Sequence, residues 1–190
     1  MRRSEEAVRD EQEPSDRDVV ERVLAGDRDA YRTLVRRYQD MLYRHALHMS
    51  GESDVAADLV QASFVKAYTS LGFCRDRDRF GAWLFRILVN ACKDHLKSRR
   101  RRDVSLDDDT VHPAAASDPL SDLERTEARA QLSTALAKLP DSLRAAFVLK
   151  HVEGMSYEEI AAIMKTSVPA LKMRVHRARE MLKQLLTETR

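Results

Sequence analysis

The stretch that decides the fold lies near the C-terminus, at residues 156–183: SYEEIAAIMKTSVPALKMRVHRAREMLK. Ser156, followed three residues later by Glu159, forms a capping box that predicts the start of a short helix. After a turn at residues 165–167, apolar residues recur every three or four positions and predict a longer helix: Val168, Leu171, Val175, Ala178, Leu182 and Leu185. Two helices joined by so short a turn are typical of a helix-turn-helix.

The polar face of the second helix is the predicted DNA-binding surface, because a helix-turn-helix places the start of its second helix in the major groove. The candidates are the side chains opposite the apolar stripe and those at the start of the first helix: Ser156, Tyr157, Pro169, Lys172, Met173, His176, Arg177 and Arg179. Lys172 and Arg177 suit either guanine edges or phosphates, and the sequence does not separate the two. A helical hairpin with a solvated basic face is the competing interpretation of these residues.

The composition favours an all-α protein. The chain has 190 residues, of which 43% are hydrophobic and 34% charged, with only five Gly and five Pro to break helices. The net charge of +2 does not by itself indicate a nucleic-acid partner. Cys74 and Cys92 lack metal-ligand spacing, and no signal peptide or membrane-spanning run is present, so we expect a soluble cytoplasmic protein.

Helical periodicity divides the chain into two small helical domains. Residues 1–16 read as a disordered tail, and residues 17–102 contain four predicted helices, with a loop of alternating charge at 72–79. Residues 103–123 hold Asp107, Asp108 and Asp109 and two prolines but no period, which predicts a flexible acidic linker. Periodicity resumes in residues 124–190.

Four separate stretches of the chain match one family. LPDSLRAAFVLKHVEGMSYEEIAAIMKTSVPALKMRVHRAREML resembles the promoter-binding domain of extracytoplasmic-function (ECF) sigma factors. AGDRDAYRTLVRRYQDMLYRHA, AADLVQASFVKAY and FGAWLFRILVNACKDHLKSRRRR resemble the N-terminal domain of that family, so the resemblance covers residues 18–102 and 125–186. It implies a transcription initiation factor, not an enzyme, with a region-2 helical bundle and a region-4 helix-turn-helix.

The resemblance also implies partners. Core RNA polymerase would be bound through the clamp helices of its largest subunit and the flap of its second-largest subunit. Promoter DNA would be recognised at its minus-ten and minus-thirty-five elements, and an anti-sigma factor is an expected inhibitor. We expect no cofactor, metal, membrane or small-molecule substrate. The acidic linker would thread the RNA channel of the polymerase, although a solvated spacer is an equal alternative.

Further site residues follow from the same resemblance. Minus-ten recognition and melting would involve the charged loop and the helix after it, through Phe73, Arg75, Asp76, Arg79, Asn90, Lys93, Lys97, Arg99 and Arg100. Polymerase binding would use Asp58, Gln61, Phe64 and Lys66 on the preceding helix. Without the resemblance, the polar residues of both helices would be ordinary surface positions. Trp83 falls on an apolar stripe and is more simply read as a core residue.

Other functions have weaker support. A helix-turn-helix regulator that binds an operator but not polymerase remains an alternative. An enzyme is disfavoured because the sequence has no glycine-rich phosphate loop, nucleophile–base arrangement or metal-ligand cluster, and His45 and His48 lack a third ligand. A redox role for Cys74 is a separate hypothesis. Two departures from the family pattern, Lys165 or Thr166 at the turn and Met173 on the recognition helix, leave the promoter sequence open.

Overall fold

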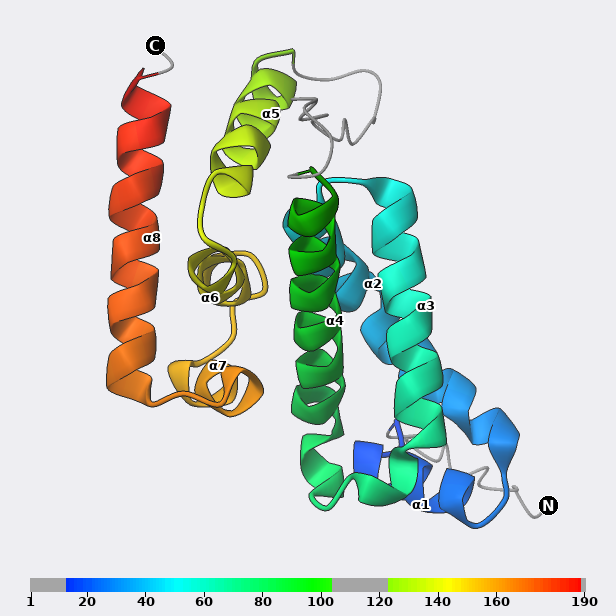
Figure 1. Cartoon of the computed structure of the whole chain (residues 1–190). Helices are drawn as coiled ribbons and strands as arrows, with labels where there is room; N and C mark the ends of the chain where they lie inside the picture. The colour runs from blue at the N-terminus through cyan, green and yellow to red at the C-terminus, as the bar shows by residue number, and fades with distance from the viewer. Residues whose placement is uncertain (1–12, 104–122, 189–190) are drawn as a thin grey trace, which may run out of the picture.

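The computed structural model describes residues 13–103 and 123–188, and the central part of the predicted linker, residues 104–122, lies outside them. Within the described residues the chain is helical and contains no strand, which confirms the all-α prediction (Figure 1). The N-terminal unit comprises α1 (Asp16–Leu24), α2 (Tyr31–Ser50), α3 (Ser53–Thr69) and α4 (Phe80–Asp103). The C-terminal unit comprises α5 (Leu123–Ala137), α6 (Asp141–His151), α7 (Tyr157–Met164) and α8 (Val168–Glu188).

The first helix begins earlier than the sequence suggested. Ser15 caps α1 in a reciprocal capping box with Asp18, so α1 begins at the last residue of the predicted tail, of which residues 1–12 lie outside the described residues. Asp16 is already helical and accepts hydrogen bonds from the Arg37 guanidinium and the Tyr38 hydroxyl of α2. These two contacts attach the start of α1 to α2 within the N-terminal unit.

The helix-turn-helix forms as predicted. The Ser156 side chain accepts a hydrogen bond from the backbone N–H of Glu159, whose carboxylate accepts one from the N–H of Ser156, which completes the capping box of α7. Lys165 ends α7 with a φ of 49°, in the left-handed region that usually favours glycine. The Ser167 hydroxyl then accepts from the N–H of Ala170 at 3.3 Å at the start of α8.

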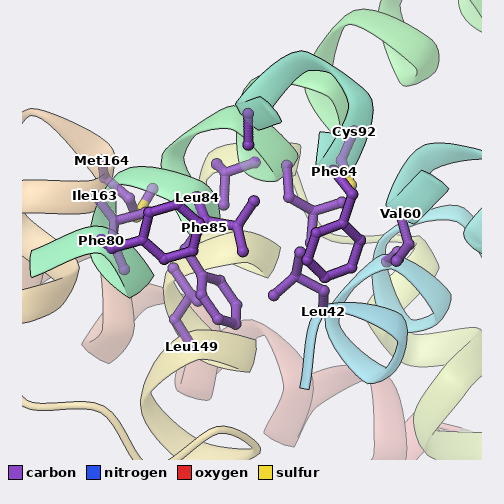
Figure 2. Close-up of a cluster of buried hydrophobic side chains, with 14 of the residues drawn as sticks. Leu42, Val60, Phe64, Phe80, Leu84, Phe85, Cys92, Leu149, Ile163 and Met164 are labelled. Carbon is purple, nitrogen blue, oxygen red and sulfur yellow. The ribbon is translucent and has the colours of Figure 1, made fainter. Parts of the chain in front are cut away.

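The two units are not separate bodies. One buried cluster runs through both, and Figure 2 shows Leu149, Ile163 and Met164 of the C-terminal unit beside Phe80, Leu84 and Phe85 of α4. The sequence predicted two domains connected by a linker, and this shared core was not foreseen. A second, smaller cluster, which includes Leu136, Val148 and Leu182, joins α5, α6 and α8 within the C-terminal unit.

Candidate nucleic-acid interface

The predicted DNA-binding face of α8 is exposed to solvent. Leu171, Val175, Ala178 and Leu182 are buried along one side of the helix. Six of the residues predicted from the sequence are exposed on the other side: Pro169, Lys172, Met173, His176, Arg177 and Arg179. Met173 is 53% exposed, so this cationic face presents an apolar side chain at its centre.

The start of α7 supports that surface. The Ser156 hydroxyl donates to the Glu159 carboxylate at 2.7 Å, so it primarily shapes the helix end. Hydrogen bonds from Ser156 lower the pKa of Glu159 below its ordinary value. The ring of Tyr157 lies under two ammonium groups, with Lys150 Nζ 4.7 Å and Lys172 Nζ 5.6 Å from its centroid. Sequence reasoning missed Lys150, which also donates to the Met155 carbonyl at 2.9 Å.

The charged segment at residues 72–79 is more ordered than a plain loop. A single-turn 3-10 helix stands at each end of it, Leu71–Phe73 and Arg77–Arg79. Arg17 of α1 donates to both carboxylate oxygens of Asp78, at 2.8 and 2.5 Å, and Arg77 donates to Glu21 at 2.9 Å. These anchors, which were missed, leave the predicted residues of the segment exposed: Phe73, Arg75, Asp76 and Arg79. Phe73 is 81% exposed.

The predicted melting residues of α4 have different surroundings. Asn90 is exposed, whereas Arg99 donates to Glu52 at 2.6 Å. The C-terminal half of α4 forms one wall of a groove of about 790 Å³ against the start of α6, lined by Lys93, Asp94, Lys97, Arg100, Arg101, Asp141 and Ser142. Burial, together with the charge of Arg174, lowers the pKa of Lys93, and Arg100 forms an ion pair with Asp141. Trp83 is partly buried and packs on Phe80, with their ring centroids 5.9 Å apart, as expected for a core position.

The outer face of α3 is hollowed into a shallow groove of about 530 Å³. Its lining contains three of the four residues predicted to bind polymerase, together with three neighbours: Asp58, Gln61, Ala62, Val65, Lys66 and Thr69. Phe64, the fourth, is only 8% exposed and lies in the core, where its ring meets that of Tyr31 edge-on. In this structure Phe64 supports α3 from beneath, and a surface role for it is not consistent with its burial.

Comparisons with known proteins identify the family. The description "Sigma-70 region 2" matches residues 34–102, and "Sigma-70, region 4" matches residues 129–182. The ECF RNA polymerase sigma-E factor of Escherichia coli K12 is 37% identical, over 87% of this chain and 91% of its own length. This chain is an ECF sigma factor. The RNA polymerase sigma-H factor of Pseudomonas aeruginosa is 35% identical, over 90% of the sigma factor described here and 93% of its own length.

Two solved structures share the fold. CnrH, in complex with the cytosolic domain of CnrY, is 31% identical with a TM-score of 0.69 and covers 92% of this chain and 99% of its own. The sigma factor RpoE of Bartonella quintana, in complex with the anti-sigma factor NepR, is 29% identical with a TM-score of 0.68, and the match covers 84% and 98% of the two chains. The region-2 match covers α3 and most of α2 and α4, and the region-4 match covers α6, α7 and most of α8.

The two cysteines of the sigma factor lie away from solvent. The thiols of Cys74 and Cys92 are buried, and burial raises the pKa of both, that of Cys92 to about 12. A thiolate is thereby disfavoured at both positions, which weakens the redox hypothesis for Cys74. Across residues 13–103 and 123–188, no group of three or more potential metal ligands gathers, and no helix is long and apolar enough to cross a membrane.

Proposed function

We propose that this ECF sigma factor divides promoter recognition between its two units. Residues 17–102 would bind and open the minus-ten element, and residues 124–190 would bind the minus-thirty-five element and the polymerase flap. The observation that carries this proposal is the exposure of the cationic face of α8, in a chain that also displays Phe73 and Asn90 on its N-terminal unit.

The exposed loop suits the capture of an unpaired base. A flipped base is held by stacking on an aromatic ring and by hydrogen bonds to its edge, which offset part of the cost of unpairing. Phe73 offers an exposed ring, and Asn90 offers both a donor and an acceptor. Arg75 and Arg79 would bind phosphates on either side of such a base. The tether of Arg77 and Asp78 to α1 would hold the loop in place during melting.

The face of α8 suits duplex DNA in the major groove. Arg177 and Lys172 can contact guanine or phosphate oxygens, while Met173 can contact the methyl group of thymine. The groove on α3 suits helices of the polymerase clamp, because exposed Val65 provides apolar area between Asp58 and Lys66. Recognition of this kind requires no covalent step by the sigma factor, so we assign it no catalytic residue and no cofactor.

The test separates the two units by matched variants. Arg177→Ala should weaken binding to a minus-thirty-five duplex, and Phe73→Ala should impair opening, measured by the fluorescence of 2-aminopurine at the minus-ten element. Both variants should bind core polymerase like the wild type in gel filtration, as should the surface control Arg36→Ala. Loss of core binding by Arg177→Ala would overturn this division. A wild-type chain that bound DNA but never core polymerase would favour the operator-binding regulator.

An anti-sigma factor is a further proposed partner. Both similar solved structures are complexes, one of CnrH with the cytosolic domain of CnrY and one of RpoE with the anti-sigma factor NepR. By analogy, we infer that a protein inhibitor binds this chain in the cytoplasm, where it would compete with core polymerase. Co-purification of the tagged chain from cells, followed by competition with core polymerase, tests that inference.

A further inference from the structure

Buried polar atoms without partners gather where the two units meet. Among the described residues, such side-chain atoms are both ring nitrogens of His45, Nε of Arg144 and Oε1 of Glu153. His45 belongs to α2, whereas Arg144 and Glu153 belong to the C-terminal unit. We call Arg44, His45, Arg144 and Glu153 the polar seam.

The contacts of the seam join the units directly. Arg144 donates to the Met49 carbonyl of α2 at 2.7 Å and to the carbonyls of Ala137 and Leu139 within its own unit. Arg44 forms an ion pair of 3.2 Å with Glu153, whose side chain is fully buried. His45 lies in α2 between these two contact points, is fully buried, and packs edge-on against Phe85 at 6.0 Å. Phe85 in turn lies beside Leu149 of α6 (Figure 2).

The seam opposes the closure that the apolar core favours. Burying Leu149, Ile163 and Met164 against α4 stabilises the closed arrangement of the two units. A buried polar atom without a hydrogen bond costs free energy that water would restore on opening. The free energy of closure is therefore the difference between the gain from apolar burial and the cost of the unpaired polar atoms. A positive charge added at the polar seam would shift this difference toward the open state.

Closure places the start of α6 against the basic end of α4 and leaves the proposed DNA-binding face of α8 free. The groove between α4 and α6 takes in Lys93, Lys97 and Arg100, and Arg100 is paired with Asp141 of α6. The recognition face of α8 remains exposed. The two promoter elements are about 25 base pairs apart, roughly 85 Å of duplex. A compact chain of 190 residues has a radius of gyration of only about 16 Å, so reading both elements requires opening.

We propose that the closed arrangement is an autoinhibited state whose opening is coupled to protonation of His45. This inference goes beyond the proposed recognition roles and concerns the free chain. Opening would hydrate the imidazole, release Arg144 from α2, and free the basic end of α4 for DNA.

The direction of the pH effect follows from the surroundings of His45. Burial lowers the pKa of His45 from 6.5 to about 3, and the charges of His48 and Lys93 act in the same direction. Arg44 and Arg144 add further positive charge at the seam. The neutral ring is therefore the form that closure accommodates, and an open chain binds a proton more readily. Opening becomes more favourable as pH falls below 6.5.

Two neighbours modify the response. Burial also lowers the pKa of His48, which reinforces acid-induced opening. Burial raises the pKa of Glu153, so the closed state holds that proton more readily and Glu153 acts in the opposite direction. In a Glu153→Gln variant this opposing contribution disappears, and the open-to-closed ratio should rise about tenfold between pH 7.5 and 5.5 from His45 alone.

Energy transfer between dyes on Gln39→Cys and Gln184→Cys, both exposed, tests the proposal in the free chain. The wild type should open as pH falls from 7.5 to 5.5, and His45→Leu should stay closed because it replaces two unpaired nitrogens with hydrocarbon. Glu153→Gln should open more steeply, and His95→Leu, which removes a partly buried histidine of α4, should follow the wild type.

A pH-independent wild type, or an opening curve unchanged by His45→Leu, would overturn the proposal. Circular dichroism at each pH separates opening from unfolding, and the Glu153→Gln curve gives an independent test if His45→Leu does not fold. Because no DNA or polymerase is present, the result does not depend on the proposed recognition roles.

Discussion

At the scale of single residues, the ring of Tyr157 supports two lysines beside the proposed DNA-binding surface. Lys150 and Lys172 both lie within cation–π distance of it. We expect Tyr157→Phe to retain affinity for a minus-thirty-five duplex, because the ring stays. Tyr157→Leu should weaken binding by about 0.5–1 kcal/mol, since both ammonium groups lose their support. Fluorescence anisotropy checks this, and equal losses in both variants would show instead that the hydroxyl matters.

We expect Met173 to contribute to DNA sequence preference through an apolar contact with a base. Its side chain is 53% exposed among cations that can bind phosphates of any sequence. Met173→Ser should change the difference in binding free energy between bases at one minus-thirty-five position by about 1 kcal/mol. The salt dependence of binding should stay unchanged. Selection from a randomised element measures the preference. A uniform loss across all sequences would contradict a role in base readout.

At the scale of elements, the packing of α4 on α2 requires glycine at position 81, where Tyr38 of α2 approaches the backbone of α4. A Cβ on Gly81 would lie 2.7 Å from the hydroxyl oxygen of Tyr38 and under 3 Å from two ring carbons. Because Tyr38 is held by Asp16, Gly81→Ala should lower the free energy of unfolding by about 1–3 kcal/mol. Urea denaturation measures it. Gly72→Ala is the matched control, since nothing lies within 4 Å of a Cβ there.

The capping box of α7 makes a pH-dependent prediction. Ser156→Ala should lower the free energy of unfolding by about 1 kcal/mol at pH 7. The pKa of Glu159 is lowered by its bonds to Ser156, so this stabilisation is present above the ordinary value of 4.5 and is lost as pH falls through the lowered value. The difference from wild type should therefore shrink in acid. An equal difference at pH 7 and pH 3 would show that the Glu159 carboxylate does not contribute to the stabilisation. Ser98→Ala, which changes an exposed serine of α4, serves as the control.

Local signals determined how much of these elements could be predicted from the sequence. Spacings of three and four residues predicted the helices, and Ser156 with Glu159 predicted the start of α7, because both rest on contacts within one turn. Phe64 lies in the apolar set of its helix, and only the family resemblance assigned it to polymerase binding, whereas the space required at Gly81 depends on another helix and could not be read from periodicity. The anchors of the charged loop were missed because Arg17 and Asp78 are far apart in the chain.

At the scale of the whole molecule, the shared core was the feature furthest from the sequence. The apolar faces of α4 and α7 each satisfy a helical pattern, and nothing in that pattern says which helix covers which. The full burial of His45, whose ring packs against Phe85, likewise depends on tertiary packing that the helical pattern does not specify. The closed arrangement thus combines two units, each predictable on its own, through an interface that local reasoning cannot reach.

That arrangement predicts unequal access to the two promoter elements in the free chain. The proposed DNA-binding face of α8 is exposed in the closed state, whereas Lys93 and Arg100 line the groove beside α6. Arg144→Ala removes the hydrogen bond to the Met49 carbonyl and should favour opening. Affinity for a minus-ten single strand should then rise, while affinity for a minus-thirty-five duplex should stay the same. Anisotropy titrations at one salt concentration measure both affinities, because salt alone changes phosphate binding.

Equal gains in affinity for both DNAs would mean that closure does not selectively restrict α4. An unchanged minus-ten affinity in a variant shown to be open would place the melting surface elsewhere.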